Sequence, residues 1–217
     1  AKVNKDAKAA MDKEWNKLQD QGVWDLSTVC ERKDIVAYCK RKGITAHFCR
    51  LAQMCYLKGS ELAEGDPGRK YKGRCVLLGD QVIDHENLWA QFQELSSNPA
   101  TIAASRMCDA YALLPGNCGT TGDAVSAYTQ AFMLSEDGSI ETWVKIPDDR
   151  QPPEWKGKYV DPWCRLKLAL YGHPDSGGMW EEKCDSALQS IDFVPLGEAW
   201  PSVYWHEGYK ALLCVYV

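Results

Sequence analysis

The spacing of apolar side chains along the chain predicts where its helices lie. Within Ala7–Asp20, apolar residues recur at helical spacing and charged residues fall between them, which is typical of an amphipathic helix. A second helix is expected over Ala100–Leu114, because Ser97-Asn98-Pro99 favours a helix start and Pro115-Gly116 favours a stop. A further helix is expected over Gly178–Ile191, where bulky apolar residues again share one side.

Short apolar runs bounded by turn residues predict the strands. His47–Leu57 and Tyr71–Leu78 flank a Gly-rich turn and are expected to pair as a hairpin. Thr142–Ile146 is a further short strand, ended by a proline. Val203–His206 and Lys210–Val217 flank a Glu-Gly turn, so they predict a second hairpin.

The order of these elements predicts an α+β fold. Residues 211–217 are almost wholly apolar, so they are expected to form a central, buried strand. Pro147–Lys158 is rich in Pro, Lys and Gly and is expected to be a surface loop. Helices and hairpins in this order indicate an antiparallel or mixed sheet with covering helices.

Composition indicates a soluble globular protein. The chain has 217 residues, of which 45% are hydrophobic, and it includes 9 Trp and 10 Tyr. That is enough apolar material for one sizeable core or two small ones. No run approaches the roughly 18 apolar residues that a membrane span requires, so no membrane span is expected.

The cysteines favour free thiols. The chain has 10 Cys but no C-x-x-C pair, which argues against a zinc ribbon or knuckle. A chain of this size does not need disulfides for stability, so buried free thiols in a reducing intracellular compartment, cytoplasm or nucleus, are expected. A disulfide framework is the alternative.

Charge is distributed unevenly. Residues 1–74 hold 16 Lys and Arg against 10 Asp and Glu, whereas residues 75–217 hold 9 against 20. A basic front half beside an acidic back half is typical of a phosphate-facing lobe next to a cation-binding lobe. Ordinary solvated faces are the alternative interpretation.

Several blocks of sequence follow one another in a recognisable order. They are Ala10–Leu18 with Trp24-Asp25-Leu26, Arg69–Val76, Ser97–Thr101, Asp123–Tyr128, Leu170-Tyr171-Gly172 with Trp180, and Ala211–Val217. Together they resemble the reverse transcriptase domain of copia-type retrotransposon polyproteins, in a divergent branch that reads L-Y-G-H-P-D-S-G at residues 170–177. The resemblance implies the fingers and partial palm of a right-hand polymerase, with residues 1–95 fingers-like and residues 96–217 a partial palm.

The resemblance implies that Asp123 is catalytic and binds metal. Two-metal nucleotidyl transfer needs carboxylates that hold two Mg²⁺ or Mn²⁺ ions, and the family carries the first of them on a palm strand beside the 211–217 hairpin. Tyr128 would then bind the dNTP, its ring excluding a 2′-hydroxyl. Taken alone, Asp123 also fits the N-cap of a helix over Ala124–Phe132.

The resemblance also implies a dNTP-binding role for Lys72, Arg74, Tyr171 and Gly172. Lys72 and Arg74 occupy alternate positions of a predicted strand, so both cations lie on one face, where they fit the β- and γ-phosphates. A solvated hairpin face is the alternative. Gly172 fits a pocket wall because a side chain there would intrude.

The functional hypothesis is a fragment of an RNA-directed DNA polymerase whose partners are an RNA or DNA template–primer and a dNTP. In the family, two aspartates follow the strand that here ends at Val217, so this chain is expected to be inactive on its own. The alternative is a non-catalytic, retrotransposon-derived structural or interaction subunit of a larger assembly. The acidic back half and the unusual Thr120-Thr121-Gly122 before Asp123 motivate it.

Overall fold

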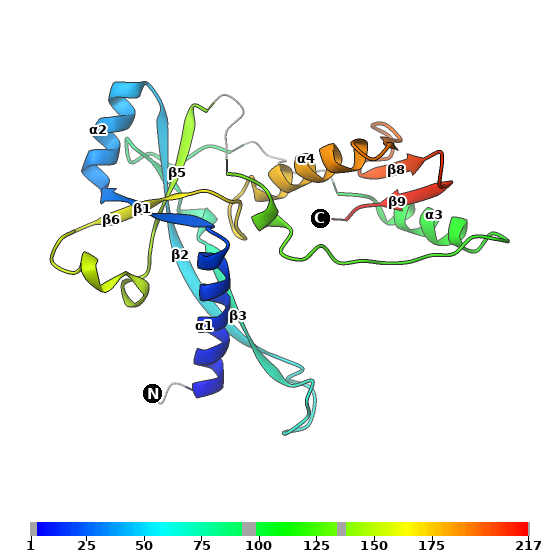
Figure 1. Cartoon of the computed structure of the whole chain (residues 1–217), viewed down its shortest axis with the longest axis horizontal. Coiled ribbons are helices and arrows are strands. Elements are labelled where there is room, and N and C mark those ends of the chain that lie inside the picture. Colours follow the sequence, from blue (N-terminus) through cyan, green and yellow to red (C-terminus); the bar gives the residue numbers. More distant parts are fainter. Residues whose placement is uncertain (1–3, 93–98, 134–137, 217) are drawn as a thin grey trace. The chain divides into compact units, whose positions relative to one another are not determined.

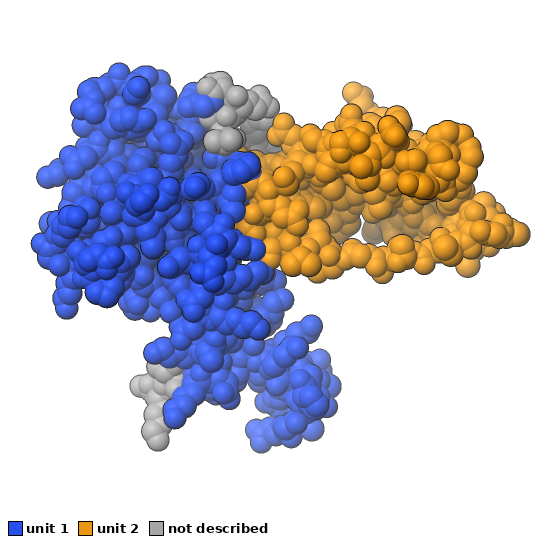
Figure 2. Space-filling model, in the orientation of Figure 1, with its two compact units in different colours: residues 1–91, 132–173 blue, residues 92–131, 174–217 orange. Residues whose placement is uncertain are grey.

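A computed structural model describes residues 4–92, 99–133 and 138–216 of the chain. It divides into two compact units, which are coloured separately in Figure 2. Unit 1 comprises residues 1–91 and 132–173, and unit 2 comprises residues 92–131 and 174–217. Each unit is therefore built from two separate stretches of chain. The assignment of residues 1–95 and 96–217 to fingers and palm stays a prediction.

Unit 1 begins with the predicted amphipathic helix, α1 (Lys5–Asp20). The Asn4 side chain caps it by accepting hydrogen bonds from backbone N–H groups of the first turn. Its buried residues are Trp15 and Leu18, and the Trp15 ring packs on that of Trp24 with centroids 4.6 Å apart. The helix therefore buries its apolar side, as the sequence pattern indicates.

The predicted hairpin is confirmed as β2 (Thr45–Lys58) and β3 (Lys70–Leu77), which pair antiparallel. Figure 1 shows α1 lying along this hairpin. Gly73 makes the contact close, because a Cβ atom at this position would lie 2.5 Å from the carbonyl oxygen of Ala10. The face of β3 that carries Gly73 therefore packs against α1.

The hairpin belongs to a mixed sheet, so the coarse α+β prediction is confirmed. The strand order is β1-β6-β5-β2-β3, with β4 also paired to β2. The pair β2 and β5 is parallel, and the other neighbours are antiparallel. Besides the hairpin, its strands are β1 (Trp24–Glu31), β4 (Ile83–Asp84), β5 (Ile140–Lys145) and β6 (Pro162–Leu166).

Helix α2 (Arg32–Lys42) packs on this sheet and closes a core. Its Ile35 and Cys39 meet apolar side chains of β2, β5 and β6. Phe48 and Trp163 form an edge-to-face pair with ring centroids 5.0 Å apart. Gly43 ends the helix with φ 67°, a left-handed conformation that suits glycine. The amino acid pattern alone had not predicted α2, β1 or β6.

Unit 2 contains the two other predicted helices, α3 (Ile102–Ala112) and α4 (Ser176–Gln189). Thr101 caps α3, while Ser97 and Asn98 lie outside the described residues. A separate sheet has the order β7-β8-β9, formed by β7 (Phe193–Pro195), β8 (Val203–His206) and β9 (Ala211–Cys214). None of the described helices has the length and apolarity needed to cross a membrane.

The prediction that residues 211–217 form a central, buried strand is wrong. Strand β9 pairs with β8 alone among the described residues, and all its side chains are only half-buried. The central strand is β8, where Val203 is fully buried. The apolar side chains of β9 pack on α3 instead of lying between two layers.

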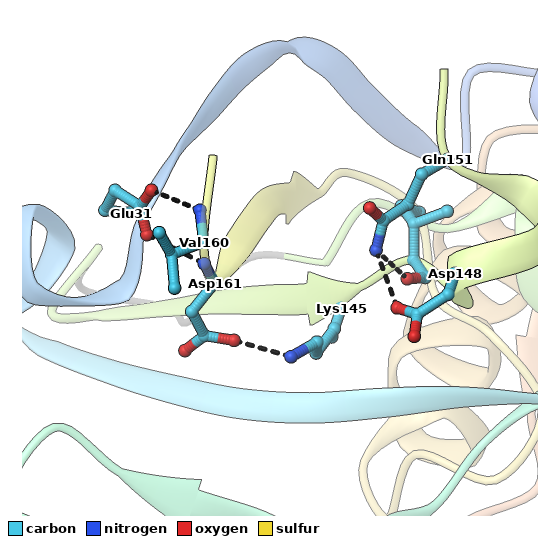
Figure 3. Close-up of polar contacts among 7 residues, drawn as sticks. Glu31, Lys145, Asp148, Gln151, Val160 and Asp161 are labelled. Atoms are coloured by element: carbon cyan, nitrogen blue, oxygen red, sulfur yellow. Dashed lines mark hydrogen bonds and ion pairs between the residues drawn. The ribbon is translucent and has the colours of Figure 1, made fainter. Parts of the chain in front are cut away.

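The predicted surface loop Pro147–Lys158 is followed by two residues, Val160 and Asp161, that are held by Glu31 and Lys145. It contains two short 3₁₀ helices, Asp148–Arg150 and Pro153–Trp155. Figure 3 shows the Glu31 carboxylate accepting hydrogen bonds from the backbone N–H groups of Val160 at 2.7 Å and Asp161 at 2.9 Å. Lys145 pairs with the Asp161 carboxylate at 2.6 Å. These contacts connect the chain just after the loop to β1 and β5.

Substitution Glu31→Gln should lower the melting temperature and change its pH dependence. The two backbone hydrogen bonds to the Glu31 carboxylate lower the pKa of this group from its ordinary value of 4.5. Its contribution is therefore fully present above about pH 4.5 and is lost as the pH falls through the lower folded pKa. Thermal unfolding at several pH values measures this difference.

The matched control is Glu61→Gln, which changes an exposed carboxylate in the β2–β3 turn. The melting temperature of Glu31→Gln should lie below that of Glu61→Gln, and this difference should be largest near neutral pH and become smaller in acid. An equal melting temperature for the two variants at pH 7 would show that the hydrogen bonds from Val160 and Asp161 to Glu31 do not stabilise the fold.

Candidate functional site

Two cations project from the outer face of β3. The strand alternates between exposed and buried positions, so Lys72 is exposed and Arg74 is half-buried, while Gly73 and Cys75 are buried on the side of α1. The alternation predicted from the sequence is thereby confirmed. Lys72 and Arg74 share one face because they are two residues apart on a strand.

Two tyrosine side chains lie beside these cations. Tyr56 on β2 lies directly across from Lys72 in the strand register. Partial desolvation raises the pKa of Tyr56, but hydrogen bonds with Arg74 and Lys72 and their charges lower it overall. The guanidinium of Arg74 lies over the ring of Tyr171, 4.9 Å from its centroid. Arg74 is therefore held between two aromatic residues.

Tyr171 and Gly172 are fixed against the end of β3 by backbone contacts. The Leu77 N–H donates to the Tyr171 carbonyl at 2.7 Å. Gly172 has φ 92°, and a Cβ atom there would lie 2.0 Å from the Leu77 carbonyl oxygen. Only glycine suits both the conformation and the space. The next residue, His173, is buried, which lowers its pKa to about 4, so it adds no positive charge at neutral pH.

The structure thus brings together four of the residues singled out from the sequence. They come from two distant segments of the chain: Arg74 lies over the Tyr171 ring, Gly172 approaches Leu77 at the end of β3, and Lys72 lies two residues before Arg74 on the same face of the strand. We call Tyr56, Lys72, Arg74 and Tyr171 the hairpin cluster. Two cations beside aromatic rings can bind a phosphate group and stack on a flat ring.

Asp123 and Tyr128 lie in unit 2 and are not part of the hairpin cluster. Asp123 is exposed and lies outside any strand, so its expected position on a palm strand is wrong. Its alternative role as cap of a helix over residues 124–132 is wrong as well, because only the short 3₁₀ helix Tyr128–Gln130 forms there.

The physical reason lies in the residues after Asp123. Ser126 has φ 55°, a left-handed conformation that interrupts both strand and helix. The Gln130 side chain donates to the Val125 carbonyl at 2.9 Å, and the Thr129 hydroxyl to the Ser126 carbonyl at 3.0 Å. These local side-chain bonds stabilise a turn.

The arrangement of potential metal ligands is known for the described residues. Within residues 4–92, 99–133 and 138–216, no group of three or more His, Cys, Asp or Glu side chains is placed to hold a metal ion. Asp123 offers a single carboxylate, whereas a two-metal centre needs carboxylates that share the ions.

Sequence reasoning missed Tyr56 as a member of the hairpin cluster. The residue lies in the predicted strand His47–Leu57, but its position opposite Lys72 depends on the register of the hairpin. In the structure Tyr56 is 46% exposed, so it does not belong to the apolar core that hydrophobic patterning detects. A register argument from the hairpin turn is the one signal that would have found it.

Comparison of the chain with protein-family models, curated proteins and solved structures gave no match. The likeness to reverse transcriptases therefore rests on the residues of this sequence, and its functional meaning is a proposal.

Substitution Gly172→Ala should destabilise unit 1 by about 3 kcal/mol, from left-handed strain together with the clash against Leu77. The control Gly157→Ala has a similar φ of 77° but open space around it, so it should cost only about 1 kcal/mol. Denaturant unfolding followed by Trp fluorescence compares the two. Equal losses of unfolding free energy in the two variants would show that the close approach of Gly172 to Leu77 does not make this position more sensitive to a side chain.

Proposed function

We propose that the chain is part of an RNA-directed DNA polymerase and that the hairpin cluster binds the phosphates of the incoming dNTP. The observation that carries the proposal is the contact between the two blocks Arg69–Val76 and Leu170–Gly172. The resemblance assigns both blocks to one dNTP pocket, and Arg74 lies over the Tyr171 ring at 4.9 Å.

The chemistry of the cluster supports phosphate binding. A guanidinium carries five N–H donors, so Arg74 can keep its hydrogen bond with Tyr56 and still donate to phosphate oxygens. Lys72 adds a compact positive charge on the same strand face. The close backbone contact at Gly172 and the hydrogen bond from Leu77 to the Tyr171 carbonyl hold the backbone of Tyr171 in place beside Arg74.

Asp123 is proposed as the first carboxylate of the metal site, and Tyr128 as the residue beside the sugar. Both assignments come from the resemblance. The exposed position of Asp123 leaves its carboxylate accessible to a metal ion. The partners of the proposed site are Mg²⁺ or Mn²⁺, a dNTP and an RNA or DNA template–primer. A second carboxylate, supplied in the family by an aspartate pair, would complete such a site.

A non-catalytic interaction subunit is the second candidate. The observation that favours it is the exposure of large apolar side chains on and after α3, where Ile102 is 74% and Leu113 85% exposed. A protein partner that covered α3 would remove these side chains from water. In this case the chain would bind a protein stoichiometrically and would show no steeply salt-dependent binding of nucleic acid.

Removal of either cation of the hairpin cluster should weaken dNTP binding. We expect Lys72→Ala and Arg74→Ala each to raise the dissociation constant of a fluorescent dNTP about tenfold, because each removes a charge-assisted contact to phosphate. Lys40→Ala is the matched control, since it removes an exposed cation from the end of α2. Equal affinity in all three variants would rule out the cluster as the phosphate site.

Asp123→Asn should abolish DNA synthesis in a polypeptide that continues the chain through the aspartate pair. We expect incorporation of dNTP in a primer-extension assay to fall at least about a thousandfold, because a metal-holding carboxylate is lost. Asp109→Asn, a change of another exposed acid in unit 2, is the control. Absence of incorporation by the unsubstituted polypeptide with either metal would overturn the polymerase proposal.

A further inference from the structure

Unit 2 holds two cysteine thiols in contact. Cys108 lies on α3 and Cys214 ends β9, the strand that packs on α3, and the two thiols are close enough for each to shift the pKa of the other. All ten cysteines of the chain are free thiols in the structure. The two residues lie far apart in sequence, so the tertiary packing of α3 on β9 makes this contact.

That packing is fixed by independent contacts along both elements. Ala104 of α3 and Val203 of β8 are fully buried in one cluster, and Leu212 and Cys214 of β9 pack against it. Near the other end of β9, the Tyr111 hydroxyl donates to the Lys210 carbonyl at 2.7 Å. Ala104, Cys108 and Tyr111 follow one another at helical spacing, so a single stripe of α3 faces β9.

The thiol pair is accessible to small molecules. Both cysteines are only partly buried, in contrast to the four fully buried cysteines of unit 1, which are Cys39, Cys49, Cys75 and Cys164. Cys108 also lines a cavity of about 700 Å³ formed by α3, the 116–121 segment and β9. The exposed Cys118 lines the same cavity, which makes it the natural competitor of Cys214.

We propose that Cys108 and Cys214 are a redox-active thiol pair that a low-molecular-weight disulfide, such as oxidised glutathione, converts into an intramolecular disulfide. This inference does not depend on the proposed polymerase function.

The local chemistry assigns the order of the steps. Burial raises the pKa of both thiols, and the interaction between them raises the pKa of Cys108 further while it opposes the rise at Cys214, so we assign Cys214 as the attacking thiol. Its thiolate attacks one sulfur of the glutathione disulfide, breaking the S–S bond and releasing one glutathione thiolate, which takes up a proton. Cys108 then loses its proton and attacks the Cys214 sulfur, releasing the second glutathione. Both cysteines are oxidised and one disulfide is reduced to two thiols.

The disulfide would join the end of β9 to α3. Strand β9 is an edge strand with one neighbour among the described residues, so the bond would restrain one edge of its sheet. It would also close a long loop of chain, which limits the unfolded state and stabilises the folded one. Oxidation would therefore raise the melting temperature of unit 2, and a reducing agent would reverse the rise.

The test is to incubate the 217-residue chain with oxidised glutathione and then alkylate the remaining thiols after denaturation. We expect an internal disulfide, recognised by a loss of about 2 Da before alkylation and by two fewer alkylated cysteines. Peptide mapping without reduction should identify a Cys108–Cys214 link. This result comes from the unsubstituted chain, so it does not depend on any variant folding correctly.

The variants test the pairing. Cys108→Ser should stop at a glutathione adduct on Cys214, about 305 Da heavier, because no second thiol resolves it. Cys214→Ser should lack the internal link, whereas the control Cys118→Ser should still form it. A Cys108–Cys118 link, or adducts on Cys118 with no internal disulfide, would overturn the proposal.

Discussion

The first unit depends on how closely two other segments approach the backbone of β3. At Gly73 the strand lies against the main chain of Ala10 in α1, and at Leu77 it lies against Gly172, and neither glycine position has space for a Cβ atom. These two contacts leave β3 little freedom to shift or turn over. The outward direction of Lys72 and Arg74 follows from them, because the opposite face of the strand is already occupied. The proposed phosphate site is therefore a consequence of backbone packing.

Burial also decides which ionisable groups carry charge and which thiols react. Within the core of unit 1, burial raises the pKa of Cys39 to about 11 and that of Cys75 to about 12, so both stay protonated at neutral pH. His173 is neutral for the same physical reason. In unit 2 the partly buried pair Cys108 and Cys214 is open to the reagents that the core of unit 1 excludes.

The residues of the polymerase proposal are divided between the units, and their support differs accordingly. In unit 1, the two blocks that the resemblance assigns to a dNTP pocket contact each other through Arg74, Tyr171 and Gly172. In unit 2, Asp123 lies in an irregular segment, and the family's strand position for it is not found. The dNTP-binding proposal therefore rests on tertiary contacts, whereas the metal-binding proposal rests on the sequence pattern. Binding and catalysis are accordingly separate questions for this chain.

The sequence by itself determined the elements whose apolar periodicity is strong: α1, the β2–β3 hairpin, α3, α4 and the β8–β9 hairpin. It also determined that Lys72 and Arg74 share a face, because alternation is a local property of a strand. Only the tertiary structure decided that β9 is an edge strand, that Tyr56 joins the cations, and that Gly172 meets Leu77. Local spacing reports which side of an element is apolar, but it carries no information about which distant segment covers that side. The turn after Asp123 depends on left-handed Ser126 and side-chain bonds to the backbone, which periodicity does not register.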